Sequence, residues 1–180
     1  MSVLRLFIAA YPPPEVVSPL LSAADLLALG SLKPSPPDQV HLTLVYIGDT
    51  DERQLDDVIE SMHRAAAGFA PISVDVSRLI ALPERGAARL IAAELTSPPT
   101  LVELQKRLVQ RLTRTKPSHD RGFLPHLTLA RFPGTGVALD RRAWEPPGAS
   151  FSITDLRLMS SVLATSGAVH CERARCNLGS

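Results

Sequence analysis

An internal repeat restricts the fold of this chain more than any other feature of its sequence. The tetrapeptide His-Leu-Thr-Leu occurs at 41–44 and again at 126–129. A random chain of this composition would contain ~0.006 copies of it. Lys-Pro-Ser precedes each copy, at 33–35 and 116–118, and the segment 72–79 (ISVDVSRL) matches 151–158 (FSITDLRL) in the same order. Three matches in one order indicate a duplicated unit.

Hydrophobic periodicity predicts similar elements in both halves of the chain. Strands are predicted at 3–10, 40–47, 72–82, 88–96, 126–131, 150–162 and 168–177, and helices at 13–29, 51–67 and 99–114. Since no loop is long enough to separate independent domains, residues 1–180 are predicted to form one bilobal domain. The predicted architecture is two similar α+β lobes about a pseudo-twofold axis, with a groove between them.

Composition places the chain among ordinary globular proteins. It has 180 residues, of which 45% are hydrophobic and 21% charged. A net charge of +1 gives no overall argument for nucleic-acid binding. The apolar stretch 3–11 is too short to cross a membrane and lacks a signal-peptide cleavage pattern, so a cytoplasmic protein is expected. The odd spacing of Cys171 and Cys176 favours unpaired thiols, and the five histidines are too scattered for a zinc site.

Each His-Leu-Thr-Leu segment places its polar side chains on one face of a strand. Alternation puts His41 and Thr43 on one face and the two leucines on the other, and it does the same for His126 and Thr128. If the two strands face each other across the groove, two imidazoles and two hydroxyls converge. Such a site suits a phosphate, because hydroxyls donate to phosphoryl oxygens and imidazoles exchange protons near neutral pH.

Two opposed histidines can hydrolyse a phosphodiester without a metal. One neutral ring takes a proton from the nucleophile, and one charged ring gives a proton to the leaving oxygen. This predicts a bell-shaped pH dependence, with each histidine contributing about 10²- to 10⁴-fold in rate. The alternative is that duplication copied a structural core histidine twice.

The sequence resembles the two-histidine phosphoesterases, and within them the RNA 2′,3′-cyclic phosphodiesterases, also called 2′-5′ RNA ligases. The resemblance depends on both His-x-Thr segments, the opening segment 4–9 (LRLFIA) and the segment 123–131 (FLPHLTLAR). It implies a bilobal α+β fold with two antiparallel sheets lining a cleft and helices on the outer faces. It also implies hydrolysis of a terminal 2′,3′-cyclic phosphate to a 2′-phosphate, with no metal or other cofactor.

The same resemblance implies roles for individual residues. His41 is the expected general acid for the departing ribose O3′, and His126 the base that activates water. Thr43 and Thr128 are expected to hold the phosphoryl oxygens. Two further residues are expected to contact substrate: Arg131 through its charge and by stacking on a base, and Phe7 by base stacking.

Arg131 conflicts with simple alternation, which turns it toward the core with the leucines of its segment. Either the strand ends or twists at Ala130, or Arg131 is a structural arginine. The first is favoured, because burying an unpaired arginine is costly. His170 lies on the last predicted strand and is given no chemical role.

Other functions remain open. The same chemistry suits 2′-5′ linked oligonucleotides or a small cyclic phosphate such as ADP-ribose 1″,2″-cyclic phosphate. A non-catalytic module that binds RNA ends is the third alternative. Ligase activity is expected only as the reverse of hydrolysis. The expected partner is RNA ending in a cyclic phosphate, and the expected state is a monomer.

Overall fold

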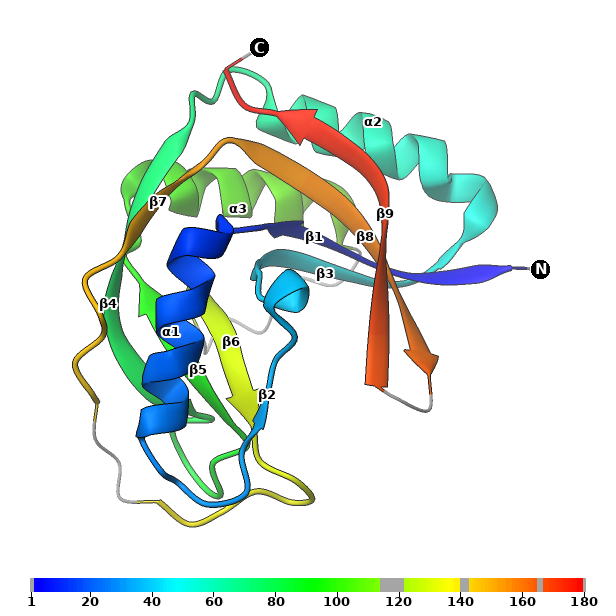
Figure 1. The fold of residues 1–180 in the computed structure, drawn as a ribbon. Helices are drawn as coiled ribbons and strands as arrows, with labels where there is room; N and C mark the ends of the chain where they lie inside the picture. Colours follow the sequence, from blue (N-terminus) through cyan, green and yellow to red (C-terminus); the bar gives the residue numbers. More distant parts are fainter. Residues whose placement is uncertain (1, 114–121, 140–142, 165–166, 180) are drawn as a thin grey trace.

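The structure is a computed structural model that describes all residues except 1, 114–121, 140–142, 165–166 and 180, so one Lys-Pro-Ser copy lies outside the described residues. The described chain forms a nine-stranded sheet in the order β7-β4-β5-β6-β3-β1-β8-β9, with β2 paired to β6 (Figure 1). The strands are β1 (Val3–Ala10), β2 (Lys33–Pro34), β3 (Leu42–Asp51), β4 (Ile72–Leu82), β5 (Leu90–Leu95), β6 (His126–Arg131), β7 (Ser150–Ile153), β8 (Asp155–Ala164) and β9 (Gly167–Asn177).

In the described part of the chain, three helices accompany the sheet: α1 (Pro14–Leu26), α2 (Leu55–Ala66) and α3 (Pro99–Leu112). Both α1 and α3 begin with proline, which suits a first turn because the missing N–H has no intrahelical partner there. The leucines of α3 at positions 101, 104 and 108 are completely buried, as the helical period requires. Two short 3₁₀ turns, Pro37–Gln39 and Glu52–Gln54, lie on either side of β3 along the chain.

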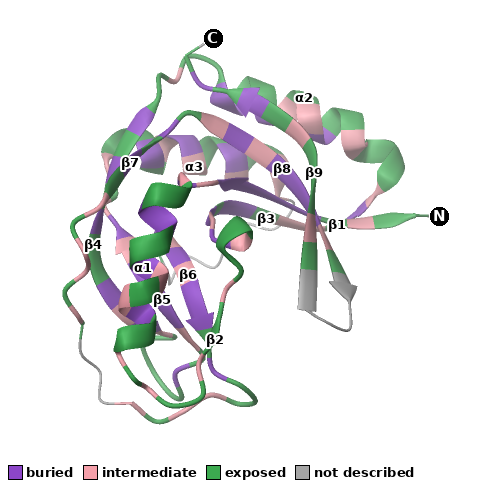
Figure 2. Cartoon of the chain, in the orientation of Figure 1, coloured by how far each residue is buried: buried purple, intermediate pink, exposed green. Residues whose placement is uncertain are grey.

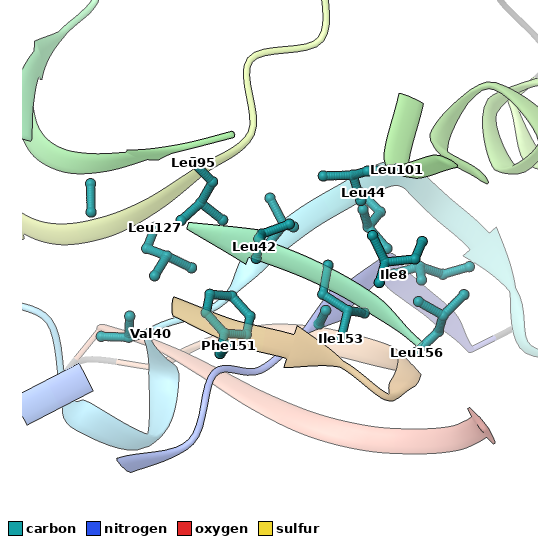
Figure 3. Packing of buried hydrophobic residues seen from close by; sticks show 14 of the residues in the cluster. Ile8, Val40, Leu42, Leu44, Leu95, Leu101, Leu127, Phe151, Ile153 and Leu156 are labelled. Atoms are coloured by element: carbon teal, nitrogen blue, oxygen red, sulfur yellow. The ribbon is translucent and has the colours of Figure 1, made fainter. Parts of the chain in front are cut away.

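The main hydrophobic core lies between the helices and one face of the sheet. Ile8, Leu42 and Leu127 belong to it, and Figure 3 shows them packed with their neighbours. Buried residues alternate with exposed ones along β4, as expected for a strand with one covered face (Figure 2). On the opposite face of β1 and β8, Phe7, Ala9 and Met159 form a small second cluster with Tyr11. We call this face of the sheet, away from the main core, the open face.

The sheet consists of two antiparallel halves that join edge to edge. One half contains β7, β4, β5 and β6, and the other contains β3, β1, β8 and β9. The two halves meet where β3 and β6 pair at Leu42 and Leu127. The predicted α+β class with antiparallel sheets is confirmed. However, the two histidine strands are neighbours within one curled sheet instead of facing each other across a gap.

The matching segments 72–79 and 151–158 each pair with the first strand of the other repeat. β4, from the first half of the chain, pairs with β5, and β8 pairs with β1. Leu79 lies opposite Ala93 in the first of these pairs, and Leu158, the counterpart of Leu79 in the repeat, lies opposite Ile8 in the second. Each half of the sheet is therefore built from strands of both repeats.

β3 and β6 carry the same irregularity. In the β1–β3 pair no residue of β1 lies opposite Leu44, and in the β5–β6 pair no residue of β5 lies opposite Leu129. Each leucine is the extra residue of a β-bulge, and an extra residue shifts the alternation of the strand by one position. Tyr46 and Arg131, which follow the bulges, therefore point to the open face.

Two smaller predictions concern the chain as a whole. No helix in the described ranges is long and apolar enough to cross a membrane. Both cysteines are free, with Cys171 exposed and Cys176 buried, which confirms the prediction of unpaired thiols.

Candidate active site

His41 and His126 are each held by a hydrogen bond to the carbonyl two residues earlier in the chain. Nδ1 of His41 lies 2.6 Å from the carbonyl oxygen of Gln39, and Nδ1 of His126 lies 2.9 Å from that of Leu124. A carbonyl oxygen only accepts, so Nδ1 carries the hydrogen in both rings. In the neutral rings Nε2 is therefore the nitrogen without a proton, and it can accept one or, once protonated, donate one.

The pairing of β3 with β6 places the four polar residues of the two segments in one block. The strands are antiparallel with Leu42 opposite Leu127, so one step in either direction brings His41 beside Thr128 and Thr43 beside His126. Both leucines are at most 1% exposed, which turns the four polar side chains to the open face. We call these four residues the His/Thr block.

Arg131 lies on the same face as the His/Thr block. The bulge at Leu129 restores it to the open face, where its side chain is exposed. Of the two alternatives that the sequence left open, the structure therefore favours the first. The strand twists before Arg131, and this arginine is not a buried structural residue. The cause is the extra residue in β6, one position before the predicted twist at Ala130.

Three aromatic rings surround His41. The centroid of its imidazole lies 5.3 Å from that of Phe7, 5.4 Å from Tyr11 and 5.3 Å from His170. The His170 ring also meets Phe7 edge-on at 5.0 Å. The imidazole of His41 is thus confined on several sides, which limits its rotation and its contact with water.

This environment makes protonation of His41 unfavourable. Burial lowers its pKa most, the hydrogen bond to the Gln39 carbonyl opposes this, and the charges of His170, Arg131 and His126 lower the pKa as well, to about 4 in all. In the protein without substrate, His41 is therefore neutral at pH 7. A neutral imidazole is a proton acceptor until a bound anion raises its pKa.

Phe7 packs against the two imidazoles of His41 and His170. It is 4% exposed and contacts both His41 and His170, so it has no free face for a base to stack on. The expected stacking role of Phe7 does not fit this burial, and the physical reason is that the imidazoles cover its ring.

Tyr11 and His170 join the site although the sequence analysis gave them no role. Burial raises the pKa of Tyr11 to about 12, and the guanidinium of Arg157 lies 4.8 Å above its ring. The Tyr11 hydroxyl and His170 Nδ1 are buried without a hydrogen-bond partner. Tyr11 extends the two-residue period of Phe7 and Ala9, a signal that the sequence analysis missed. His170 comes from a distant strand, and the pairing of β1 with β8 and of β8 with β9 brings it here.

The chemistry of the site follows from these groups. Two imidazole nitrogens, two hydroxyls and one guanidinium lie on one face, a set that can bind an oxyanion and transfer protons on both sides of it. Within the described residues, no three His, Cys, Asp or Glu side chains lie close enough to hold a metal ion.

Comparison with known proteins identifies the family. Residues 12–163 match the family described as the 2′-5′ RNA ligase superfamily. A Thermus thermophilus protein named RNA 2′,3′-cyclic phosphodiesterase is 30% identical over 175 residues, which cover 84% of this chain and 88% of the relative. A protein of the same name from Archaeoglobus fulgidus is 24% identical over 174 residues, covering 93% and 96%.

Solved structures show the same fold. The crystal structure of TT0787 from Thermus thermophilus has a TM-score of 0.80 and 27% identity, covering 97% of this chain and 98% of that one. The structure of Escherichia coli LigT with 3′-AMP has a TM-score of 0.78 at 20% identity, covering 99% and 100%. Sequence and fold agree over nearly the whole length, and this chain belongs to the 2′-5′ RNA ligase superfamily.

Proposed function

We propose that the protein is a metal-independent RNA 2′,3′-cyclic phosphodiesterase, which hydrolyses a terminal 2′,3′-cyclic phosphate to a 2′-phosphate. The observation that carries this proposal is the His/Thr block, in which two imidazoles with the same tautomer each lie beside a threonine of the neighbouring strand. The names of the relatives from Thermus and Archaeoglobus support the same reaction.

The reaction requires two proton transfers on opposite sides of phosphorus. Nε2 of His126 takes a proton from water, and the water oxygen forms a bond to phosphorus. The bond between phosphorus and O3′ breaks, and Nε2 of His41 gives its proton to O3′. The threonine hydroxyls of the block donate to the non-bridging oxygens, and Arg131 supplies positive charge. The product is a 2′-phosphate and a free 3′-hydroxyl.

His41 needs a proton to act as the acid, although its pKa in the free protein is lowered to about 4. The bound phosphodiester supplies the missing stabilisation, because a negative charge beside an imidazole raises its pKa. Substrate binding and protonation of His41 are therefore coupled. This coupling keeps the acid uncharged until substrate is present.

The proposal extends to ligase activity, oligomeric state and location in the cell. If a 5′-hydroxyl takes the place of water, it gives its proton to His126 and its oxygen bonds to phosphorus, the P–O3′ bond breaks, and a 2′-5′ linkage forms. The protein acts as a monomer, because one chain completes the His/Thr block. Its unpaired cysteines suit the reducing cytoplasm.

A hydrolysis assay tests the proposal. A short RNA ending in a 2′,3′-cyclic phosphate is incubated with the protein in EDTA, and phosphorus NMR identifies the product. We expect the 2′-phosphate to form at the same rate with and without EDTA. We expect His41→Ala and His126→Ala each to lower kcat by about 10²- to 10⁴-fold. His63→Ala, on the exposed side of α2, is the matched control and should keep full activity.

Other outcomes favour the alternatives. Hydrolysis confined to ADP-ribose 1″,2″-cyclic phosphate or to 2′-5′ linked oligonucleotides would change the substrate and keep the chemistry. Binding of the RNA without turnover would indicate a binding module. Loss of activity in EDTA would contradict the two-histidine mechanism.

A further inference from the structure

Tyr46 and Arg131 occupy equivalent positions in the two halves of the site. Each lies five residues after the histidine of its segment. In each strand the extra leucine, Leu44 or Leu129, turns this side chain to the open face. Both side chains are exposed, and Tyr46 is 55% exposed. The repeat has therefore kept the position and changed the chemistry, from a guanidinium to a phenol ring.

The two side chains lie at opposite ends of the His/Thr block. β3 and β6 run antiparallel through Leu42 and Leu127. In β6, Thr128 lies beside His41, and Arg131 follows three residues later. In β3, Thr43 lies beside His126, and Tyr46 follows three residues later. A phosphate held between the two imidazoles therefore has the guanidinium toward one end and the phenol ring toward the other.

Tyr46 is an aromatic side chain that the open face presents to a ligand. It lies directly opposite Phe7 in the β1–β3 pair, so the two rings occupy neighbouring places on the same face. Phe7 is 4% exposed and Tyr46 is 55% exposed. The accessible phenol ring, and not the buried phenyl ring, can therefore stack on a planar group.

A cation lies beside this ring. Arg5 precedes Phe7 by two residues on the open face of β1, and its Nε donates to Asp49 at 3.2 Å. The hydrogen bond to Asp49 raises the pKa of Arg5, and electrostatic interactions with the nearby Tyr46 and with Asp49 add to the rise. A guanidinium has five N–H donors. An aromatic ring next to a guanidinium is a combination that binds single-stranded nucleic acid, through base stacking and phosphate contact.

We propose that Tyr46 is a nucleobase-binding residue for a second nucleotide, one other than the nucleotide that carries the reacting phosphate. This inference rests on the proposed function, because it takes the phosphate to lie between His41 and His126. The second base has two sources: the preceding nucleotide of the same RNA, or the nucleoside on the far side of a 2′-5′ linkage. Stacking on Tyr46 serves both.

The test compares three substrates: cytidine 2′,3′-cyclic phosphate, a dinucleotide ending in a 2′,3′-cyclic phosphate, and a 2′-5′ linked dinucleoside monophosphate. Removing an aromatic ring that stacks on a base lowers affinity by about 5- to 150-fold. We expect Tyr46→Ala to raise KM for at least one two-base substrate at least fivefold more than for the single nucleotide, with a smaller change in kcat. Tyr46→Phe should behave like the original protein, since stacking needs the ring alone.

Each result has a defined meaning. A selective loss on the cyclic dinucleotide assigns the base to the preceding nucleotide, and a selective loss on the 2′-5′ substrate assigns it to the far nucleoside. Equal losses on all three substrates, or no loss on any, overturn the proposal. A loss in Tyr46→Phe as large as in Tyr46→Ala overturns stacking. Val102→Ala, an exposed apolar truncation on α3, is the control and should change none of the three.

A binding measurement separates this inference from the proposed function. If the original protein hydrolyses none of the three substrates, the proposed function fails. Calorimetric titration with a tetranucleotide ending in a 2′-phosphate then still tests Tyr46. A Kd raised at least fivefold in Tyr46→Ala supports the inference, and an unchanged Kd overturns it.

Discussion

The two histidines of the site make the same kind of hydrogen bond but lie in different environments. Both donate Nδ1–H to a carbonyl two residues earlier in the chain. Only His41 is enclosed by aromatic rings, which come from β1, the residue that follows it and β9. A symmetric repeat has thus produced an asymmetric pair, as a reaction that needs one acid and one base requires.

The enclosure of His41 predicts a pH dependence of stability. The folded pKa of about 4 lies below the unfolded value of 6.5, so the unfolded chain binds this proton more readily. The stability associated with His41 is fully present above pH 6.5 and is lost as the pH falls toward 4. The loss amounts to about 3 kcal/mol.

Urea unfolding at pH 7.0, 5.5 and 4.0 measures this loss, with His41→Gln as the reference that cannot titrate. Taking the difference between the two proteins removes the contributions of carboxylates and other histidines. We expect the advantage of the original protein over His41→Gln to shrink steadily with falling pH. A difference that stays constant over this range would contradict the lowered pKa.

Arg131 should affect substrate binding more than proton transfer. A hydrogen bond to a charged group contributes about 1.5–3 kcal/mol, so Arg131→Ala should raise KM for the cyclic phosphate by about 10- to 150-fold. Arg131→Lys should recover part of this, since it keeps the charge and loses the fork of donors. Arg64→Ala removes an exposed arginine from α2 and should leave KM unchanged. Unaltered kinetics in Arg131→Ala would remove it from the site.

At this scale the sequence predicted the residues that share a motif. The four members of the His/Thr block follow from the repeated tetrapeptide and strand alternation. His170 could not be predicted, because it reaches His41 only through the pairing of β1 with β8 and of β8 with β9. The burial of Phe7 could not be predicted either, since it depends on the imidazoles that cover the ring.

Whole elements were predicted closely where the apolar period is regular, as for β1 at Val3–Ala10 and β4 at Ile72–Leu82. The first predicted helix, 13–29, ends earlier, at Leu26, because Ala28 adopts a positive φ of 50°. The predicted strand 150–162 is divided into β7 and β8 at Thr154. The bulges were beyond prediction, because a bulge is a property of two paired strands and the sequence shows one strand at a time.

The contact between β3 and β6 predicts a stability effect. Leu127 is completely buried where the two halves of the sheet join. Leu127→Ala removes packed methyl groups and leaves a cavity, so it should lower the free energy of unfolding by about 2–5 kcal/mol. Urea denaturation followed by circular dichroism measures this. Leu26→Ala, at a position 83% exposed, is the matched control, and equal effects of the two substitutions would contradict the importance of this contact.

Across the whole molecule, the repeat predicted two similar units but not their connection. Along the sequence, the matching segments 72–79 and 151–158 each follow a histidine segment. In space, β4 and β8 each pair with the first strand of the other unit. Sequence order could not reveal this exchange, because antiparallel pairing with either first strand satisfies the same apolar pattern.

This exchange predicts that the chain unfolds as a single unit. Neither half of the sheet can form from one repeat alone, since β4 completes the half that contains β5 and β6. The single tryptophan, Trp144, exchanges backbone hydrogen bonds with Leu79 of β4, so its fluorescence reports on this half. Far-ultraviolet circular dichroism reports on all the strands and helices. We expect the two signals to give one coincident urea transition, and a fluorescence midpoint clearly separated from the dichroism midpoint would show that the halves unfold independently.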